Sequence, residues 1–414
     1  MKRKLIKQML NEWKANIWLV VELVVVVLIL QYIFSTLYSL YKLHDYSSGH
    51  KLENIYVGEV NWISQDNDDF MPYDSVHSYY TDFDLLMAKI RSNPYVEAAG
   101  AGTYNSLPYN FNFEGRQLVY KTSTGYSSPV YANTRIMSPE LLELLQIRGI
   151  NGETPKQLAD MLRKGWVILS EIEEKVDPQA IDPKDFLGKE VFNAGDTLVS
   201  AHVGAIAYGL RRSDYEPMYF STVYIPLEKF PRSIVVKIKP GMGRQFEESM
   251  TSDATQAGNV FLTKFTSIDT MRDSANLREE LAIRNFVICA LFIMLVIFLG
   301  FLGTFWFRTQ QRVSEIAIRK VNGATNRNIY ARFMGEGMIL LIVAVATVLL
   351  LNVGLFASET LTLGDLGLPI GSYEVLGVGL SVSVISLVLI ILAGIYAPAR
   401  RATRVDPAIA LKDM

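Results

Sequence analysis

Residues suited to metal binding are few and widely spaced in this sequence. None of the histidines has a second ligand type at the spacing of a zinc site. Asp66, Asp68 and Asp69 resemble the start of a calcium loop, but the glycine and the terminal glutamate of an EF-hand are absent. A solvated turn is therefore the favoured interpretation, and no metal site is expected. The histidines are His44, His50, His77 and His202.

Sequence motifs of nucleotide hydrolysis and of common hydrolases are also missing. The glycine cluster Gly241-Met242-Gly243-Arg244 lacks the lysine and the spacing of a phosphate-binding loop. Neither Gly-x-Ser-x-Gly nor His-Glu-x-x-His occurs. We therefore expect no enzyme activity, no cofactor and no ATP hydrolysis by this chain alone. A net charge of -2 gives no indication of a nucleic-acid partner.

Charged groups are instead concentrated in one segment, 308–336, which lies between two long apolar runs. Glu315 and Arg319 have the i, i+4 spacing that supports an exposed helix. Asn322-Gly323 predicts the end of that helix, and Thr325 can cap a second one that leads into the next apolar run. The segment is predicted to be a helical hairpin with an apolar stripe. The stripe consists of Val313, Ile316, Ala317 and Val321.

Four apolar runs are long enough to cross a bilayer core of about 30 Å, which requires roughly 20 helical residues. They are 18–38, 286–307, 338–357 and 375–397. The first run lacks a following cleavage site and is too long for a signal peptide, so an uncleaved anchor is expected. Its Glu22 either faces a cavity or partner helix, or reaches back to the membrane surface.

The distribution of basic residues predicts the topology. Lys and Arg are frequent before the first run, in 308–336 and after residue 399, but none lies between Arg332 and Arg400. The positive-inside rule therefore places both termini and the hairpin in the cytoplasm, and the long segment after the first run outside. The lone Cys289 lies within the second run, so no intrachain disulfide can form.

Apolar residues recur at helical spacing before the first run, from Leu5 to Ile17, with lysines between them. This pattern is typical of a helix in the membrane interface, although lysines that merely fix topology are an alternative. The outer segment alternates strand and helix patterns and predicts an α+β domain. Residues 267–284 lack Gly and Pro and run directly into the second apolar run, which predicts a rigid stalk helix.

The hairpin resembles the signature loop of FtsX-like ABC transporter permeases. The similarity lies in Arg312-x-x-Glu315-Ile316-Ala317-Ile318-Arg319-Lys320-x-x-Gly323-Ala324-Thr325, with Glu336 at the start of a span. The ending from Pro398 to Leu411 is similar to that family's C-terminus. Segments of the outer domain, such as 137–149 and 167–171, are similar to the MacB-type periplasmic core domain. MacB exporters carry an ATPase domain before the first span, and this chain has only a short segment there.

The resemblance implies a fold and a set of functional residues. The fold expected is an α-helical membrane protein with four transmembrane helices and a large α+β extracytoplasmic domain, MacB-type core-like, inserted between the first and second helices. ATPase coupling would involve Arg312, Glu315, Ile316, Ile318, Arg319, Lys320, Gly323, Ala324 and Glu336. Stalk residues would be Asn276, Leu277, Glu280 and Leu281.

The predicted parts follow one another without a gap. They are an amphipathic cytoplasmic helix (1–16), transmembrane helix 1 (17–40), the outer domain (41–266), the stalk (267–284), transmembrane helix 2 (285–307), the coupling hairpin (308–336), transmembrane helix 3 (337–357), a short outer loop (358–374), transmembrane helix 4 (375–397) and a cytoplasmic tail (398–414).

The resemblance also implies partners and a task. The chain is expected in the bacterial cytoplasmic (inner) membrane, in contact with lipid, with a separate ATPase subunit that alone binds ATP. A homodimer, or a heterodimer with a related permease, is expected, and an extracytoplasmic adaptor or outer-membrane partner is an option. The favoured function is efflux or export driven by movement of the outer domain. The alternatives are lipoprotein release, control of a cell-wall hydrolase, or a membrane-anchored sensor or scaffold without an ATPase.

Overall fold

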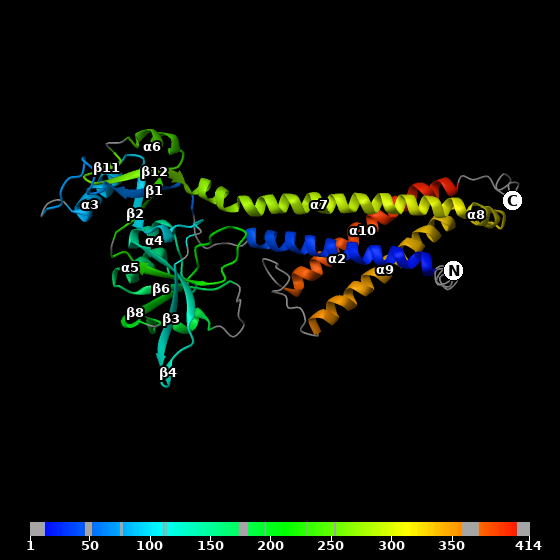
Figure 1. Cartoon of the computed structure of the whole chain (residues 1–414), viewed down its shortest axis with the longest axis horizontal. Helices are drawn as coiled ribbons and strands as arrows, with labels where there is room; N and C mark the ends of the chain where they lie inside the picture. Colours follow the sequence, from blue (N-terminus) through cyan, green and yellow to red (C-terminus); the bar gives the residue numbers. More distant parts are fainter. Residues whose placement is uncertain are drawn as a thin grey trace. The chain divides into compact units, whose positions relative to one another are not determined.

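The computed structural model describes residues 13–45, 52–74, 78–110, 112, 114–173, 181–194, 196–228, 230–251, 254–357 and 372–403. The chain divides into two compact units. The helical unit combines Met1–Lys42 with Glu279–Met414, and the outer unit comprises Leu43–Arg278. The elements of both are drawn in Figure 1. Most of the predicted interfacial helix and outer loop, and the tail beyond Thr403, lie outside the described residues.

Among the described residues, five helices belong wholly or mainly to the helical unit, and one of them, α7, begins in the outer unit. Four are long and apolar enough to cross a membrane by length and composition. This confirms the predicted set of four spans, although the helices extend beyond the apolar runs; α10, for example, continues through Pro398. The helices are α2 (Trp13–His44), α7 (Ile268–Gln311), α8 (Val313–Val321), α9 (Asn326–Ala357) and α10 (Tyr373–Ala402).

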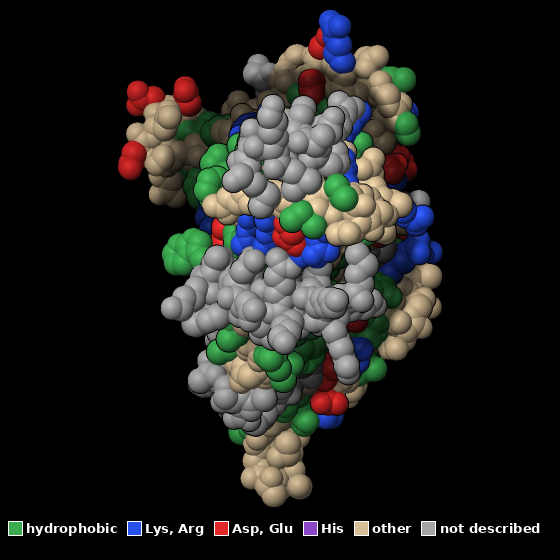
Figure 2. Space-filling model, turned by 90° about the vertical axis from the view of Figure 1, so that its right-hand side faces the viewer, with side chains coloured by type: hydrophobic (Ala, Val, Ile, Leu, Met, Phe, Trp, Pro, Cys, Tyr) green, Lys and Arg blue, Asp and Glu red, His purple; other side chains and the backbone are tan. Residues whose placement is uncertain are grey.

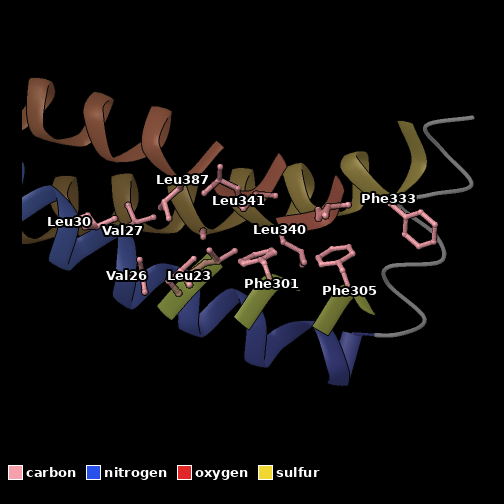
Figure 3. Packing of buried hydrophobic residues seen from close by; sticks show 14 of the residues in the cluster. Leu23, Val26, Val27, Leu30, Phe301, Phe305, Phe333, Leu340, Leu341 and Leu387 are labelled. Carbon is pink, nitrogen blue, oxygen red and sulfur yellow. The ribbon is translucent and has the colours of Figure 1, made fainter. Parts of the chain in front are cut away.

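A continuous apolar core joins these helices. In Figure 3, Leu23 and Val27 of α2, Phe301 of α7, Leu340 of α9 and Leu387 of α10 point toward one another. Each of these side chains is almost fully buried. A polar contact also joins two of these helices: the amide of Asn352 donates to Oε1 of Gln31 over 3.1 Å. That bond satisfies two amides that would otherwise be costly in lipid.

Glu22 of α2 lies beside α7. A Cβ atom added to Gly300 would be 3.7 Å from Oε1 of Glu22. The side chain nevertheless remains exposed in the isolated chain. Both positions considered from the sequence therefore remain predictions.

Close packing of α2 against α10 depends on Gly379. A Cβ atom at this position would lie 2.1 Å from the hydroxyl of Ser35 and 2.8 Å from the carbonyl oxygen of Gln31. Ser35 is fully buried and donates to the carbonyl of Val375. Ser35 therefore packs within the chain, whereas Gly377, also on α10, has nothing within 4 Å of its Cβ position.

These two glycines give a matched pair of substitutions. Gly379→Ala is expected to lower the free energy of unfolding by about 1–3 kcal/mol because the added methyl group overpacks the helix contact. Gly377→Ala should be neutral or slightly stabilising, since alanine favours the helix by up to about 1 kcal/mol. Thermal unfolding of the purified full chain in detergent measures both; equal effects would show that α10 does not pack on α2 in this way.

The outer unit is built on one continuous sheet of twelve strands. Strands β3, β5, β9, β6, β8 and β7 pair in a closed ring, because β3 bonds to both β5 and β7. Inward side chains such as Leu118, Val167 and Val223 fill this small barrel together with Phe186. An antiparallel arm, in the order β11-β12-β1-β10-β2, extends from β5. The strands are β1 (Ile55–Trp62), β2 (Val96–Gly102), β3 (Gly115–Thr122), β4 (Gly125–Tyr126), β5 (Val130–Met137), β6 (Val167–Ser170), β7 (Glu190–Asn193), β8 (Asp196–Ala207), β9 (Ser221–Pro226), β10 (Ser233–Ile238), β11 (Gln256–Ala257) and β12 (Val260–Ser267).

Short capped helices cover the sheet. Ser78 caps α3 and forms a capping box with Thr81. Ser138 caps α4, with Pro139 in its first turn. The helices are α3 (Tyr79–Ser92), α4 (Pro139–Leu144), α5 (Pro155–Arg163) and α6 (Gly243–Ser249), with 3₁₀ turns η1 (Tyr104–Ser106) and η2 (Pro183–Phe186). The α+β class predicted for this domain is thus confirmed.

Candidate functional site

The segment between the second and third spans folds as a tight hairpin. Helix α8 ends in a Schellman motif: the amide of Ala324 donates to the carbonyl of Arg319, and the amide of Gly323 to that of Lys320. Gly323 has φ +87°, a conformation that favours glycine. Thr325 then caps the next helix through the amide of Asn328. That helix is α9 itself, which continues into the third span without the break that a separate short helix would need.

A buried ion pair joins the two sides of the hairpin. Nη1 of Arg312 donates to both carboxylate oxygens of Glu336, at 2.9 and 3.0 Å. The side chains are only 15% and 4% exposed. Nε of Arg332 lies 3.8 Å from the same carboxylate. Because buried charges are costly unless paired, this contact fixes where α8 begins relative to α9.

A second, more exposed carboxylate extends this network. Glu315 accepts from Nη2 of Arg319 at 2.7 Å and from Nη2 of Arg332 at 3.2 Å. Partial burial would raise the pKa of Glu315, but the hydrogen bond from Arg319 and the charge of Arg332 outweigh it, so the pKa is lowered. Arg332 thus lies between the carboxylates of Glu315 and Glu336. The arginines on this hairpin therefore have a structural role.

The apolar residues of α8 divide into an anchoring pair and an exposed pair. Ile316 and Ala317 are 5% and 1% exposed, and Ile316 belongs to the helical core together with Ile329 and Phe333 of α9. Ile318 and Val321 are 45% and 65% exposed. The apolar stripe predicted for α8 therefore does not form one surface. Ile316 and Ala317 face the core, whereas Val321 is exposed together with Ile318.

The end of α10 also contacts the hairpin. Nζ of Lys320 donates to the carbonyl of Thr403 at 2.5 Å. Arg401 lies over the ring of Trp306 in α7, 4.6 Å from its centroid. From the end at which α8 lies, Figure 2 shows Lys, Arg and acidic side chains gathered with hydrophobic groups beside them. A small pocket of about 100 Å³ opens between α8 and α9, lined by Arg312, Glu315, Ile316, Arg319, Ala324, Asn328, Ile329, Arg332 and Phe333.

The hairpin residues proposed from the sequence are therefore brought together in part. Arg312, Glu315, Arg319 and Glu336 share one ionic network, and Gly323 and Ala324 form the helix stop. Ile316 is an internal anchor, whereas Ile318 is on the surface. Arg332 was missed, although its i, i+4 spacing from Glu336 was visible in the sequence.

The stalk residues behave differently from one another. Leu277, Glu280 and Leu281 are exposed on α7. Asn276 is only 4% exposed and is bonded within the outer unit. Its Oδ1 accepts from the hydroxyl of Ser213 and the amide of Asp214, both at 3.0 Å, and its Nδ2 donates to Oδ2 of Asp214 at 2.7 Å.

The carboxylate of Asp214 accepts two further hydrogen bonds near this contact. Nε of Arg272 donates to its Oδ2 at 2.6 Å, and the hydroxyl of Tyr109 to its Oδ1 at 3.0 Å. Burial alone would raise the pKa of Asp214, but the hydrogen bonds from Arg272 and Asn276 outweigh it, and the pKa is lowered. The first turns of α7 are thus fastened to the loop 211–214 by charge-assisted bonds.

The same loop holds the end of α2. Nη1 of Arg211 donates to the carbonyl of Leu43 at 2.8 Å, while its Nε and Nη2 bind Glu173 at 3.0 and 2.7 Å. The ring of His44 stacks on that of Tyr215. We call the loop and its partners the clamp; it is defined by Leu43, Tyr109, Glu173, Arg211, Ser213, Asp214, Arg272 and Asn276. Apart from Asn276, none of its members was identified from the sequence, because they come from five separate segments.

The aspartates and histidines that were considered as metal ligands lie in an exposed turn or pack against other side chains where the structure describes them. Asp66, Asp68 and Asp69 lie in an exposed turn, as expected. His202 packs against Trp166, whereas His50 and His77 lie outside the described residues. In the part of the chain that is described, no three His, Cys, Asp or Glu residues come together as metal ligands.

Comparison with known proteins identifies the helical part. Residues 287–407, which include the hairpin and the spans around it, match the FtsX-like permease C-terminal family. The C-terminal region of this chain is an FtsX-like permease domain. The ionic network and the helix stop described above all lie inside this FtsX-like domain.

Comparisons with curated proteins and with solved structures give less information than the family match. No curated protein matches it by sequence. Among solved structures, it is similar to the extracellular domain of the noncanonic ABC-type transporter YknZ from Gram-positive bacteria, with 10% identity and a TM-score of 0.30. The match covers 50% of this chain and 100% of that one.

Proposed function

We propose that this chain is the membrane subunit of an ABC transporter in the bacterial cytoplasmic membrane, and that a separate ATPase subunit drives movement of its outer unit. The observation that carries the proposal is the rigid α8 hairpin. It is anchored from within by Ile316 and Ala317 and presents Ile318 and Val321 outward among basic residues. A loop that only joined two spans would need neither a buried ion pair nor a Schellman stop.

The proposed orientation follows from charge. The hairpin, with Arg312, Arg319, Lys320 and Arg332, would face the cytoplasm, where the ATPase is. The outer unit would then lie on the opposite side of the membrane. ATP would bind only to the partner, so this chain would act as a transmitter of force and not as an enzyme.

Docking of the ATPase is tested at Ile318. Ile318→Glu is expected to reduce co-purification of the ATPase encoded with this chain by at least about tenfold, because burying an unpaired carboxylate in an apolar contact is costly. Folding should be unaffected, since Ile318 is exposed in the isolated chain. The measurement is the ratio of ATPase to permease recovered by affinity purification from membranes.

Leu187→Glu is the matched control. Leu187 is exposed to a similar degree, 42% against 45%, but belongs to the outer unit. Its substitution should leave the ratio unchanged. Unaltered recovery with Ile318→Glu, or an equal loss with Leu187→Glu, would refute docking on α8. A sensor or scaffold without an ATPase predicts that no such complex is recovered from the wild type.

The work done by the outer unit is proposed to be efflux or export. Dimers with a second copy or a related permease would let two outer units move together. In-cell crosslinking from the outer unit would identify what it contacts: a transported compound or adaptor supports export, whereas a lipoprotein or a cell-wall hydrolase would replace that proposal with one of the alternatives.

A further inference from the structure

A buried arginine without a carboxylate partner lies in the outer unit. Arg135, on β5, is 1% exposed. Its two Nη atoms donate to the backbone carbonyls of Leu107 and Leu210. Its Nε has no hydrogen-bond partner, and no acidic side chain in the described part of the chain pairs with this guanidinium.

Such an arrangement is energetically unfavourable as it stands. Two carbonyl oxygens carry only partial charge, and a buried cation is normally accompanied by a full counter-charge. Burial lowers the pKa of Arg135 to about 10, so the guanidinium remains protonated at neutral pH. Within the described residues, no carboxylate balances this charge.

A small cavity is lined in part by Arg135. It measures about 30 Å³, and Arg135, Arg212, Asn133 and Thr222 contribute its polar lining together with Glu216. Nη2 of Arg212 is paired with Glu216 at 2.6 Å, so these two charges cancel and the lining keeps one net positive charge. The side-chain oxygen of Asn133 accepts from the amide of Glu114, which leaves its NH₂ group oriented as an available donor among the described residues.

We propose that this cavity binds a small monovalent anion of the size of chloride, held by Arg135 with Asn133 and Arg212 beside it. The size follows from the volume: one water needs roughly 10–15 Å³ measured in the same way, so a single halide fits and a sulfate does not. The bound ion would supply the missing counter-charge to a guanidinium that ties β5 to the segments around Leu107 and Leu210. This inference does not depend on the proposed transport function.

The test is the halide dependence of stability for the full chain in detergent. Thermal unfolding is followed in sodium chloride, sodium bromide, sodium sulfate and sodium gluconate at constant ionic strength. Chloride and bromide should raise Tm in a saturable way, since a ligand bound only to the folded state stabilises it, while sulfate and gluconate should not. Bromide introduced into crystals should give an anomalous peak beside Arg135.

Two variants separate this site from general salt effects. Arg212→Gln should raise the half-saturating chloride concentration about threefold, as expected for loss of a partly exposed charge. Arg244→Gln is the control, because Arg244 forms the same i, i+4 pair with a glutamate but lies away from the cavity. Arg135→Met, if it folds, should lose the chloride effect.

Three outcomes would overturn the proposal. They are a wild type whose Tm is the same in chloride and gluconate, an Arg212→Gln variant whose chloride dependence equals that of Arg244→Gln, and a crystal in which only water occupies the cavity. The Arg212 comparison decides the question even if Arg135→Met does not fold.

Discussion

Glu336→Gln is expected to lower the free energy of unfolding of the helical unit by about 3–5 kcal/mol, the loss typical when one member of a buried ion pair is removed. The substitution keeps the shape of the side chain but leaves Arg312, which is 15% exposed, without its charge partner. Arg332 loses the same neighbour. Thermal and denaturant unfolding of the purified full chain measure the effect.

Glu315→Gln provides the matched control. It is the same chemical change in the same network, and Glu315 is likewise bonded to two arginines, but its side chain is 38% exposed. Exposed pairs contribute only about 0.2–1 kcal/mol, so the loss should be several times smaller than for Glu336. Equal losses would show that Glu336 is solvated and that the ion pair does not fix the hairpin.

A compensating double variant separates charge from packing. Replacing both Arg312 and Glu336 with methionine removes the unpaired charge along with the pair, and such exchanges are often neutral or stabilising. Stability should therefore return toward the wild-type value. If ATPase co-purification stays low in that stable protein, the ion pair is needed for the position of α8 and not merely for folding.

Asn276→Ala is expected to loosen the clamp and cost about 3 kcal/mol. It removes two acceptor bonds and one donor bond to a carboxylate, and a hydrogen bond to a charged group alone is worth roughly 1.5–3 kcal/mol. Hydrogen exchange of the amides in the segment 211–215 should accelerate, because the amide of Asp214 loses its acceptor. Leu277→Ala, at the exposed neighbouring position, should leave both stability and exchange near the wild-type values.

The clamp should also weaken in acid. The pKa of Asp214 is lower in the folded chain than its ordinary value of 3.8, so its bonds contribute stability that is present above that value and is lost as the pH falls through the folded pKa. Asp214→Asn should be less stable than the wild type at neutral pH and should lose this acid dependence. Denaturant unfolding between pH 7 and pH 3 measures both; parallel profiles for the two proteins would argue against the clamp.

The sequence predicted the helical unit better than the outer one. A membrane span leaves a signal in local composition, because about 20 apolar residues are required wherever the helix lies. The hairpin was also predictable: Gly323, Thr325 and the spacing of Glu315 and Arg319 act through nearest neighbours. The burial of Ile316 but not of Ile318 was not predictable, since it depends on how α8 lies against Ile329 and Phe333 of α9.

The strand pairing of the outer unit could not be predicted from local sequence patterns. The alternation of strand and helix patterns predicted the α+β class, but the closure of six strands into a ring depends on the pairing of β3 with both β5 and β7. Register of this kind is set by long-range contacts that no local pattern encodes. The clamp was missed for the same reason: Asn276 was predicted only as a stalk residue, and its partners Ser213 and Asp214 are more than sixty residues away in the sequence.

The border between the two compact units falls inside α7, between Arg278 and Glu279, and not in a loop. Domain borders usually fall in flexible linkers that absorb insertions. A residue inserted at this border would therefore have to be accommodated by a helix and not by a loop.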